Sequence, residues 1–235
     1  MLTQRFLFEP IHKPFLLNPP PSKTQSFQQH RVWNKTVTIK SAITELGGEL
    51  QLPPNAVRRK RDPQWRGGFS LGIDLGMART GLALTKGFNI RPLTVLELRG
   101  QKLELRIISI AEQQEADEFI IGLPRSSDGK ETPQSNIVRS VAGRLAVRAA
   151  ERGWRVYLQD EHGTTTEAVD RMINMGLSKS SQQKKLDAYA AMMVLERYLS
   201  TSGQGTELVL PKNHELQEKL RRGPPKDADF FSDED

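Results

Sequence analysis

The sequence contains no cysteine among its 235 residues, which excludes disulfide bonds and cysteine-based zinc sites. It also lacks any apolar run near the roughly 20 residues that a bilayer-spanning helix needs, so we do not expect an integral membrane protein. Hydrophobic residues make up 37% of the chain and aromatic residues 6%. This low apolar share predicts one ordinary globular domain with disordered ends.

The net charge of +6 is not spread evenly along the chain. Residues 1–67 hold 11 Lys and Arg against 4 Asp and Glu, whereas residues 68–201 hold 18 against 16. Residues 202–235 hold 5 basic residues against 8 acidic ones. Most of the basic charge therefore lies outside the expected fold, and the overall charge is weak evidence for nucleic-acid binding.

Residues 1–42 have the composition of an organelle transit peptide. They are basic and rich in Ser and Thr, they contain Pro19, Pro20 and Pro21, and Glu9 is their only acid. Their modest Arg content favours a chloroplast over a mitochondrion. An ordinary disordered N-terminus of a cytoplasmic protein is the alternative, and the missing apolar core argues against a secretory signal.

Two further segments flank the expected domain. Residues 43–67 are predicted to be a basic linker that contains the run Arg58-Arg59-Lys60-Arg61. This run could contact RNA phosphates, but a solvated linker would have the same composition. Residues 202–235 are predicted to be a disordered acidic tail.

Regular alternation begins at Phe69. Phe69, Leu71 and Ile73 fall on one face of a strand, and Leu82 and Leu84 continue the pattern after a hairpin. A third strand is expected at 92–98 and further strands at 118–121 and 155–159. Helices are expected at 102–116, 134–152, 164–175 and 185–199, with a loop at 178–184. The pattern predicts an α/β fold with a mixed five-stranded sheet and helices on both faces.

Four carboxylates occupy positions at which such a sheet forms ligand sites. Asp74 ends the first strand, Asp160 and Glu161 end the strand at 155–159, and Asp187 borders the apolar stripe of the last helix. Carboxylates that converge repel one another and stay ionised mainly when a cation binds. Their hard oxygen atoms favour Mg²⁺ or Mn²⁺. Each residue also has a simpler interpretation, as the start of a loop or a helix-surface charge.

Four motifs resemble the YqgF/RuvX-like family of the ribonuclease H-like superfamily. They are GIDLGMARTGLAL, FIIGLPRSSDGKE, DEHGTT and LDAYAAMMVLERYL, which occur in the family's order and spacing over residues 69–199. The resemblance implies a ribonuclease H-like fold. It also implies that Asp74, Glu161 and Asp187 are catalytic carboxylates that bind metal, with Asp160 as the adjacent acid.

One position departs from the family pattern. The family usually has Asp-Glu-Arg-Leu where this chain has Asp160-Glu161-His162-Gly163. An arginine there could hold a phosphate or orient the glutamate, whereas His162 is shorter and Gly163 makes the loop more flexible. Activity is therefore less firmly expected than the fold.

Several polar residues are candidate nucleic-acid contacts. Backbone amides of the hairpin after Asp74 could approach a phosphate, although glycines there would equally serve a tight turn. The polar loop after the strand at 118–121 could contact a nucleic-acid backbone or lie on the surface. The candidates are Gly76, Arg79, Arg125, Ser126, Thr164, Thr165, Lys184 and Lys185.

The resemblance implies a metal-dependent endonuclease that matures pre-16S ribosomal RNA in an organelle, as a monomer or a homodimer near the small ribosomal subunit. Resolution of branched DNA at Holliday junctions is one alternative. A catalytically weak RNA-binding ribosome-assembly factor is another, because of His162 and Gly163. Nucleotide binding is a third, but the chain is too short for the two-lobed architecture of sugar kinases and actin-like ATPases.

Overall fold

A six-stranded mixed sheet forms the centre of the fold. The structure is a computed structural model that describes residues 52–64, 67–87 and 89–224, so the expected transit peptide lies outside the described residues. The strand order is β3-β2-β1-β4-β5-β6. The strands are β1 (Phe69–Leu75), β2 (Thr80–Lys86), β3 (Asn89–Leu96), β4 (Ala116–Leu123), β5 (Arg155–Asp160) and β6 (Glu207–Leu208).

The direction of the strands confirms the expected ribonuclease H-like α/β fold. β1, β4 and β5 are parallel, whereas β2, β3 and β6 run antiparallel to their neighbours. The sheet has one strand more than the five expected, because the short β6 pairs with β5. The helices are α1 (Asn55–Arg61), α2 (Gly100–Gln113), α3 (Pro133–Ala150), α4 (Thr164–Asn174), α5 (Lys179–Ser200) and α6 (His214–Arg222).

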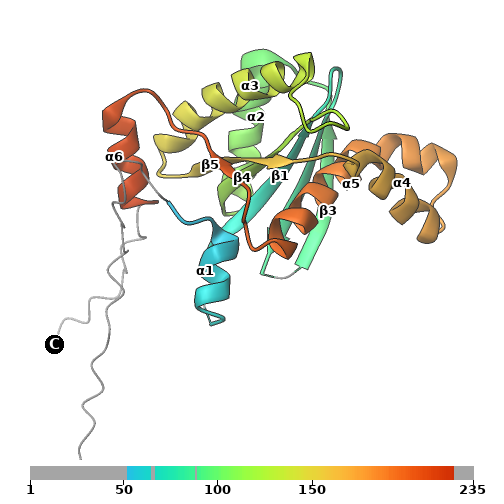
Figure 1. Cartoon of the computed structure of the whole chain (residues 1–235), viewed down its shortest axis with the longest axis horizontal. Coiled ribbons are helices and arrows are strands. Elements are labelled where there is room, and N and C mark those ends of the chain that lie inside the picture. The colour runs from blue at the N-terminus through green and yellow to red at the C-terminus, as the bar shows by residue number, and fades with distance from the viewer. Residues whose placement is uncertain (1–51, 65–66, 88, 225–235) are drawn as a thin grey trace, which may run out of the picture. The chain divides into compact units, whose positions relative to one another are not determined.

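The period-two pattern around Asp74 places its apolar residues in one core layer, as predicted. Helices α2 and α3 cover that face of the sheet (Figure 1). The layer includes Leu71, Ile73, Leu82 and Leu84 from the hairpin, Ile107 from α2, and Val138 and Leu145 from α3. Burying each of these aliphatic side chains stabilises the fold by roughly 1.5–3 kcal/mol.

Helix α5 covers the opposite face and lies very close to the sheet. A Cβ atom at Gly72 of β1 would lie 2.6 Å from Cγ of Leu195 and 2.8 Å from the carbonyl oxygen of Ala191. Glycine at this position therefore allows the helix to approach the central strand more closely than any side chain would.

Among the described residues, no helix is long and apolar enough to cross a membrane.

The helix boundaries differ from the expectation at α5. Residues 178–184 were expected to be a loop, but α5 begins at Lys179 and includes most of them. The hydroxyl of Ser178 accepts a hydrogen bond from the amide of Ser181 at 3.3 Å and caps the helix. A serine-, lysine- and glutamine-rich sequence is compatible with both states, because these side chains face solvent either way.

The flanking segments also differ from the expectation. Helix α1 forms within the expected basic linker, and β6 and α6 form within the expected disordered tail. Leu220 of α6 packs with Leu52 and Ala150, and this small apolar cluster holds both flanks against the domain. Such distant partners leave no local pattern in the sequence.

The basic run of α1 is partly structural. The guanidinium of Arg59 is buried and donates a hydrogen bond to the carbonyl of Gly68 at 2.8 Å and another to the carbonyl of Gly87. This arginine therefore attaches α1 to the sheet rather than presenting its charge to RNA.

A buried carboxylate fixes α1 and α5 to the start of β4. Glu118 is completely buried, and its Oε1 accepts hydrogen bonds from the hydroxyls of Ser70 at 2.7 Å and Tyr198 at 2.6 Å. Its Oε2 accepts from the backbone amide of Asn55 at 2.8 Å. These partners offset the high cost of burying a charge.

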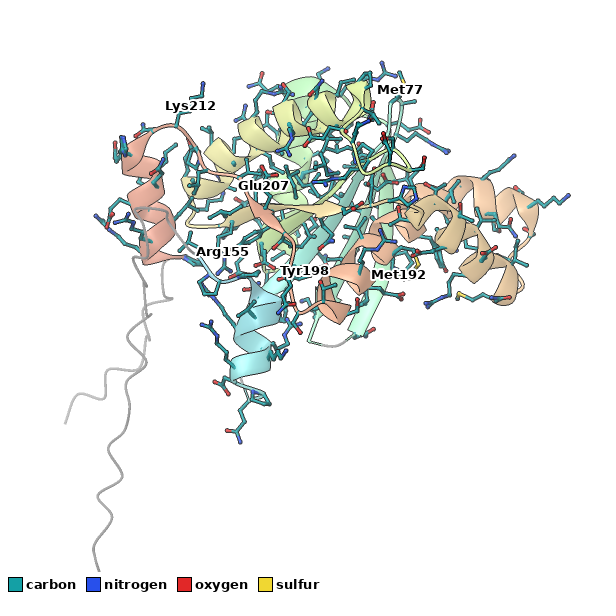
Figure 2. All side chains as sticks on the ribbon, in the orientation of Figure 1. Met77, Arg155, Met192, Tyr198, Glu207 and Lys212 are labelled. Atoms are coloured by element: carbon teal, nitrogen blue, oxygen red, sulfur yellow. The ribbon has the colours of Figure 1, made fainter. Side chains whose placement is uncertain are left out.

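Arg155 completes the same network from β5. Its Nη2 donates to the side-chain oxygen of Asn55 at 2.8 Å and to Oδ2 of Asp117 at 2.9 Å, and lies 4.0 Å from Oε2 of Glu118. Figure 2 shows Arg155 and Tyr198 on the side of the sheet where α1 lies. The segment that precedes β1 is therefore an integral part of the domain.

We expect Arg155→Met to lower the free energy of unfolding by about 3–5 kcal/mol, because it leaves Glu118 and Asp117 without their buried cation. Urea unfolding followed by circular dichroism measures this change. Arg171→Met is the matched control, because its ion pair with Glu196 is 45% and 34% exposed. The control should change stability by less than about 1 kcal/mol, and equal losses in both variants would contradict the assignment.

Candidate functional site

The ends of the parallel strands bring acidic side chains from three segments together. Asp74 lies near the end of β1, and Asp160 ends β5 with Glu161 directly after it. Asp187 comes from α5, whose backbone at this residue lies against Gly81, the partner of Asp74 in the β1–β2 pair. Ligand sites in open α/β sheets form at such strand ends.

Two glycines on the strands beside β1 allow this convergence. A Cβ atom at Gly81 would lie 1.8 Å from the carbonyl oxygen of Asp187, so a side chain there would displace α5. A Cβ atom at Gly122 of β4 would lie 1.9 Å from Oε2 of Glu161. The Glu161 carboxylate therefore fills the space that a side chain at position 122 would take.

Burial and neighbouring carboxylates raise the pKa values of Asp74 and Glu161. Burial, and then the neighbouring Asp187, raise the pKa of Asp74 to about 6. Burial, followed by Asp74 and Asp160, raises the pKa of Glu161 to about 8, while Arg197 lowers it. Asp74 thus interacts with the charge of Asp187, and Glu161 with the charges of Asp74 and Asp160.

Two buried oxygen atoms of the site have no hydrogen-bond partner in the described part of the chain. They are Oε2 of Glu161 and Oδ2 of Asp187. The second oxygen lies 2.9 Å from Nε of Arg79, which is within ion-pair distance but not aligned as a hydrogen bond. The Glu161 oxygen has no such partner within the described residues, and a bound cation would offset the cost of burying it.

The donor set fits a hard divalent cation such as Mg²⁺ or Mn²⁺. Asp74, Glu161 and Asp187 would supply its oxygen ligands. Within residues 52–64, 67–87 and 89–224, no three acidic or histidine side chains already form a coordination shell. Binding would therefore require these carboxylates to turn toward a shared ion.

Asp160 differs from the other three acids. Its Oδ1 accepts a hydrogen bond from the backbone amide of His162 at 2.9 Å, so it stabilises the loop that carries Glu161. It also contributes to the raised pKa of Glu161. Asp160 was expected to bind the metal together with the other three acids. The structure instead places it at the border of the group.

Residues 68–201 match the family described as "RuvX: Holliday junction resolvase". This chain belongs to the RuvX family. A protein from Nocardioides sp. named "Putative pre-16S rRNA nuclease" is 37% identical over 142 residues, which cover 58% of this chain and 90% of that protein. One of the same name from Anaeromyxobacter dehalogenans is 35% identical over 133 residues, 55% of this chain and 95% of that protein.

Two solved structures have a more distant likeness. Thermus thermophilus RuvC in complex with a Holliday junction substrate is 16% identical with a TM-score of 0.41, covering 60% of this chain and 99% of that one. The yeast mitochondrial Holliday junction resolvase Ydc2 is 14% identical with a TM-score of 0.34, covering 71% and 86%.

The hairpin of this RuvX-family chain supports only part of the expected nucleic-acid contacts. A Cβ atom at Gly76 would lie 2.8 Å from the carbonyl oxygen of Arg79, so the turn itself requires this glycine. Arg79 is paired with Asp187 and donates to the carbonyl of Gln183 at 3.2 Å. Met77, which follows Gly76 in the same turn, is 80% exposed (Figure 2).

The two polar loops after β4 and β5 lie next to each other. The hydroxyl of Ser126 donates to the carbonyl of Lys130 at 2.9 Å, which closes the turn that follows Arg125. The ring Nδ1 of His162 lies 3.4 Å from the carbonyl oxygen of Arg125. Arg125 is exposed, and its loop therefore borders the segment that carries Glu161.

The two threonines after Gly163 have different environments. Thr164 is 3% exposed, so its side chain lies inside the fold and does not face a ligand in solvent. Thr165 is exposed. Helix α4 does not begin with a capping box. Its N-cap is Gly163, with φ 81°, and no side chain caps the helix.

Lys184 and Lys185 line a groove beside the site. They are exposed on α5, three and two residues before Asp187. The groove, about 220 Å³ in volume, runs between this part of α5 and β3, with Pro92 and Val95 on its other side. Two cations in a groove next to a carboxylate group suit a phosphodiester backbone.

The many arginines of α3 are not available in the same way. Each of them forms an ion pair with a glutamate of another segment. The pairs are Arg139 with Glu131 and Glu207, and Arg144 and Arg148 with Glu104. Their charge is largely neutralised within the fold, so α3 is a poor candidate for the nucleic-acid surface.

Sequence analysis did not identify Arg197 of α5. Its Nη1 donates to the carbonyl oxygens of His162 at 2.8 Å and Asp160 at 3.2 Å. These partners lie 35 and 37 residues before Arg197 in the sequence, too far for a local pattern to predict the contact. Its place in the LDAYAAMMVLERYL motif was the only available signal.

We expect the metal-free protein to lose stability as pH rises. The folded pKa values, about 6 for Asp74 and about 8 for Glu161, exceed the ordinary values of 3.8 and 4.5. The folded state therefore binds protons more tightly than the unfolded state, and this stabilisation is complete below about pH 4 and lost as pH rises through 6 and 8.

Glu161→Gln should remove the upper part of that loss and make the protein more stable than the unchanged chain at pH 9, by roughly 2–4 kcal/mol. The two proteins should differ little at pH 4. Urea unfolding in EDTA at pH 4, 6, 7.5 and 9 measures the effect. Parallel pH curves for both proteins would contradict the raised pKa of Glu161.

A second prediction concerns the glycine under Glu161. Gly122→Ala should push the Glu161 carboxylate out of the site and weaken Mn²⁺ binding by about 10-fold or more, because its Cβ would lie 1.9 Å from Oε2. Isothermal titration calorimetry measures the affinity. Gly143→Ala in α3 is the matched control, because its Cβ would meet no atom within 4 Å. Equal Mn²⁺ affinity in the two variants would contradict this role of Gly122.

Proposed function

We propose that this RuvX-family chain is a divalent-metal-dependent endonuclease that hydrolyses phosphodiester bonds in structured nucleic acid. The convergence of Asp74, Glu161 and Asp187 over two glycines carries the proposal. Glu161 and Asp187 each have a buried oxygen that finds no hydrogen-bond partner among the residues that the structure describes. A protein maintains such an unfavourable group of like charges where the charges serve a ligand.

The chain's own residues would divide the work. Asp74, Glu161 and Asp187 would hold a cation, which when bound would supply Lewis-acid activation of water and neutralise charge on the scissile phosphate. Arg79 would keep Asp187 in place through their 2.9 Å ion pair. Lys184 and Lys185 would hold the phosphate backbone in the adjacent groove, and the exposed Arg125 would contact it from the other border.

The substrate we propose is precursor small-subunit ribosomal RNA. The names of the relatives at 37% and 35% identity support this choice, since each is a pre-16S rRNA nuclease by name. The description of the matching family favours a second candidate, the Holliday junction, a branched DNA. The protein would act on either substrate as a monomer or a homodimer. The RNA would be cleaved within the small ribosomal subunit or its precursor.

We propose a chloroplast as the site of action, with a mitochondrion or the cytoplasm as the alternatives. The support is the composition of residues 1–42, which are basic and hydroxylated and contain Glu9 as their only acid.

A third reading, that of a catalytically weak assembly factor, rests on the loop of His162 and Gly163. Hydrogen bonds tie this loop to β4 and to α4: the Glu161 amide donates to the Leu123 carbonyl at 3.3 Å, and the Thr164 amide to the Glu161 carbonyl at 3.0 Å. A loop anchored in this way weakens the case for lost activity.

We expect Asp74→Asn to lower cleavage of precursor small-subunit rRNA by about 100-fold or more in Mg²⁺, because it removes a metal-binding charge. EDTA should abolish cleavage by the unchanged protein. Asp170→Asn, at an exposed position of α4, is the matched control and should cleave normally. Circular dichroism checks that both variants are folded.

The same assay on a four-way DNA junction separates the two substrates. Cleavage of the junction alone would replace RNA by branched DNA in the proposal. RNA binding without cleavage by the unchanged protein, in Mg²⁺ and in Mn²⁺, would refute the nuclease and favour the assembly factor.

A further inference from the structure

The position of the Glu161 carboxylate depends on its backbone. Its Oε2 is buried, and no hydrogen-bond partner for it lies within the described part of the chain. The side chain rests over Gly122, which offers space but no directional contact. Whatever holds the backbone of residues 160–162 therefore decides where the carboxylate lies.

One guanidinium holds the peptide unit just before Glu161 and the one just after His162. Nη1 of Arg197 donates to the carbonyl oxygen of Asp160 at 3.2 Å, just before Glu161, and to that of His162 at 2.8 Å, just after it. Nη2 donates to Oε1 of Glu167 at 2.8 Å, which fixes the plane of the guanidinium. The Arg197 side chain is 25% exposed, and its contact to the Asp160 carbonyl is partly buried.

We propose that Arg197 is a positioning residue that sets the place of the Glu161 carboxylate. It does so by holding the backbone carbonyls of the two neighbouring residues, Asp160 and His162. Carbonyls that converge on one side of a loop repel each other unless a shared donor lies between them. A planar guanidinium supplies several donors in a fixed geometry, which a lysine ammonium does not. The loop therefore has a fixed conformation although His162 is exposed and Gly163 is conformationally free.

The location of Arg197 on α5 gives this contact a second consequence. The same helix carries Asp187, and its backbone lies against β1 at Gly72 and against β2 at Gly81. The loop of Glu161 is thus positioned relative to the helix that supplies another acid of the site. Any shift of α5 against the sheet would move both groups together.

The experiment compares Arg197→Met and Arg197→Lys with two controls. Arg171→Met removes another guanidinium that links α4 to α5, through its 3.0 Å pair with Glu196, but it does not contact the loop. Glu167→Gln weakens the ion pair of Arg197 and keeps its contacts to the carbonyls. The measurements are Mn²⁺ affinity by calorimetry, amide hydrogen exchange of residues 161–164, and kcat and KM on precursor rRNA.

Arg197→Met should weaken Mn²⁺ binding by about 10–100-fold, as losses of supporting contacts at metal sites do. It should also accelerate exchange at the amides of His162 and Thr164 by about 10-fold or more, because the loop opens more often. The loss in kcat should match the loss in metal affinity while KM stays within about twofold. Arg197→Lys should fall between, and both controls should remain near the unchanged protein.

Two results would overturn the proposal. One is unchanged loop exchange and Mn²⁺ affinity in Arg197→Met. The other is an equal effect in Glu167→Gln or Arg171→Met, which would assign the role to the contact between α4 and α5.

The inference rests on the proposed function only for its kinetic readout. If the unchanged protein does not cleave RNA, the nuclease proposal fails by itself, and exchange and calorimetry still decide the role of Arg197.

Discussion

The close approach of α5 to the sheet is the constraint on which the rest of the structure depends. The helix backbone occupies the space that a side chain at position 72 or 81 would need, and both positions are glycine. Near its C-terminal end, the hydroxyl of Tyr198 donates to the buried Glu118 at 2.6 Å. Near its N-terminal end, Asp187 is placed beside Asp74. A helix fixed at both ends can hold an acid against other acids without yielding to their repulsion.

Burial of the acids, followed by their mutual repulsion, is the main energetic cost of the site. Two of the acids have pKa values raised by burial and by neighbouring carboxylates, to about 6 and about 8. The fold offsets the cost elsewhere, through the Glu118 and Arg155 network at the opposite ends of the strands and through two apolar layers. A cation would convert the same charges from a cost into a binding energy, which is the usual exchange of stability for function at an active site.

The distribution of basic groups follows the same logic. A chain with a net charge of +6 suggests a surface that attracts nucleic acid broadly, yet many arginines of the described residues serve the fold. Those of α3 pair with glutamates, Arg59 and Arg155 are buried, and Arg197 holds a loop. Lys184 and Lys185 remain exposed beside the carboxylates. Charge near the site is therefore more informative than the total charge.

The sequence by itself determined the apolar layer around Asp74, the alternation of strands and helices, and the identity of the acids, because these depend on periodicities of two and 3.6 residues and on motifs of adjacent residues. The tertiary structure alone decided how the acids meet. Gly81 and Gly122 are ordinary turn or strand glycines until the partners that occupy their space are known. Arg197, α1 and α6 find their partners in distant segments, and β6 is too short to be recognised without β5. Such contacts are set by how helices and strands pack, and packing between distant segments leaves no periodic trace in the chain.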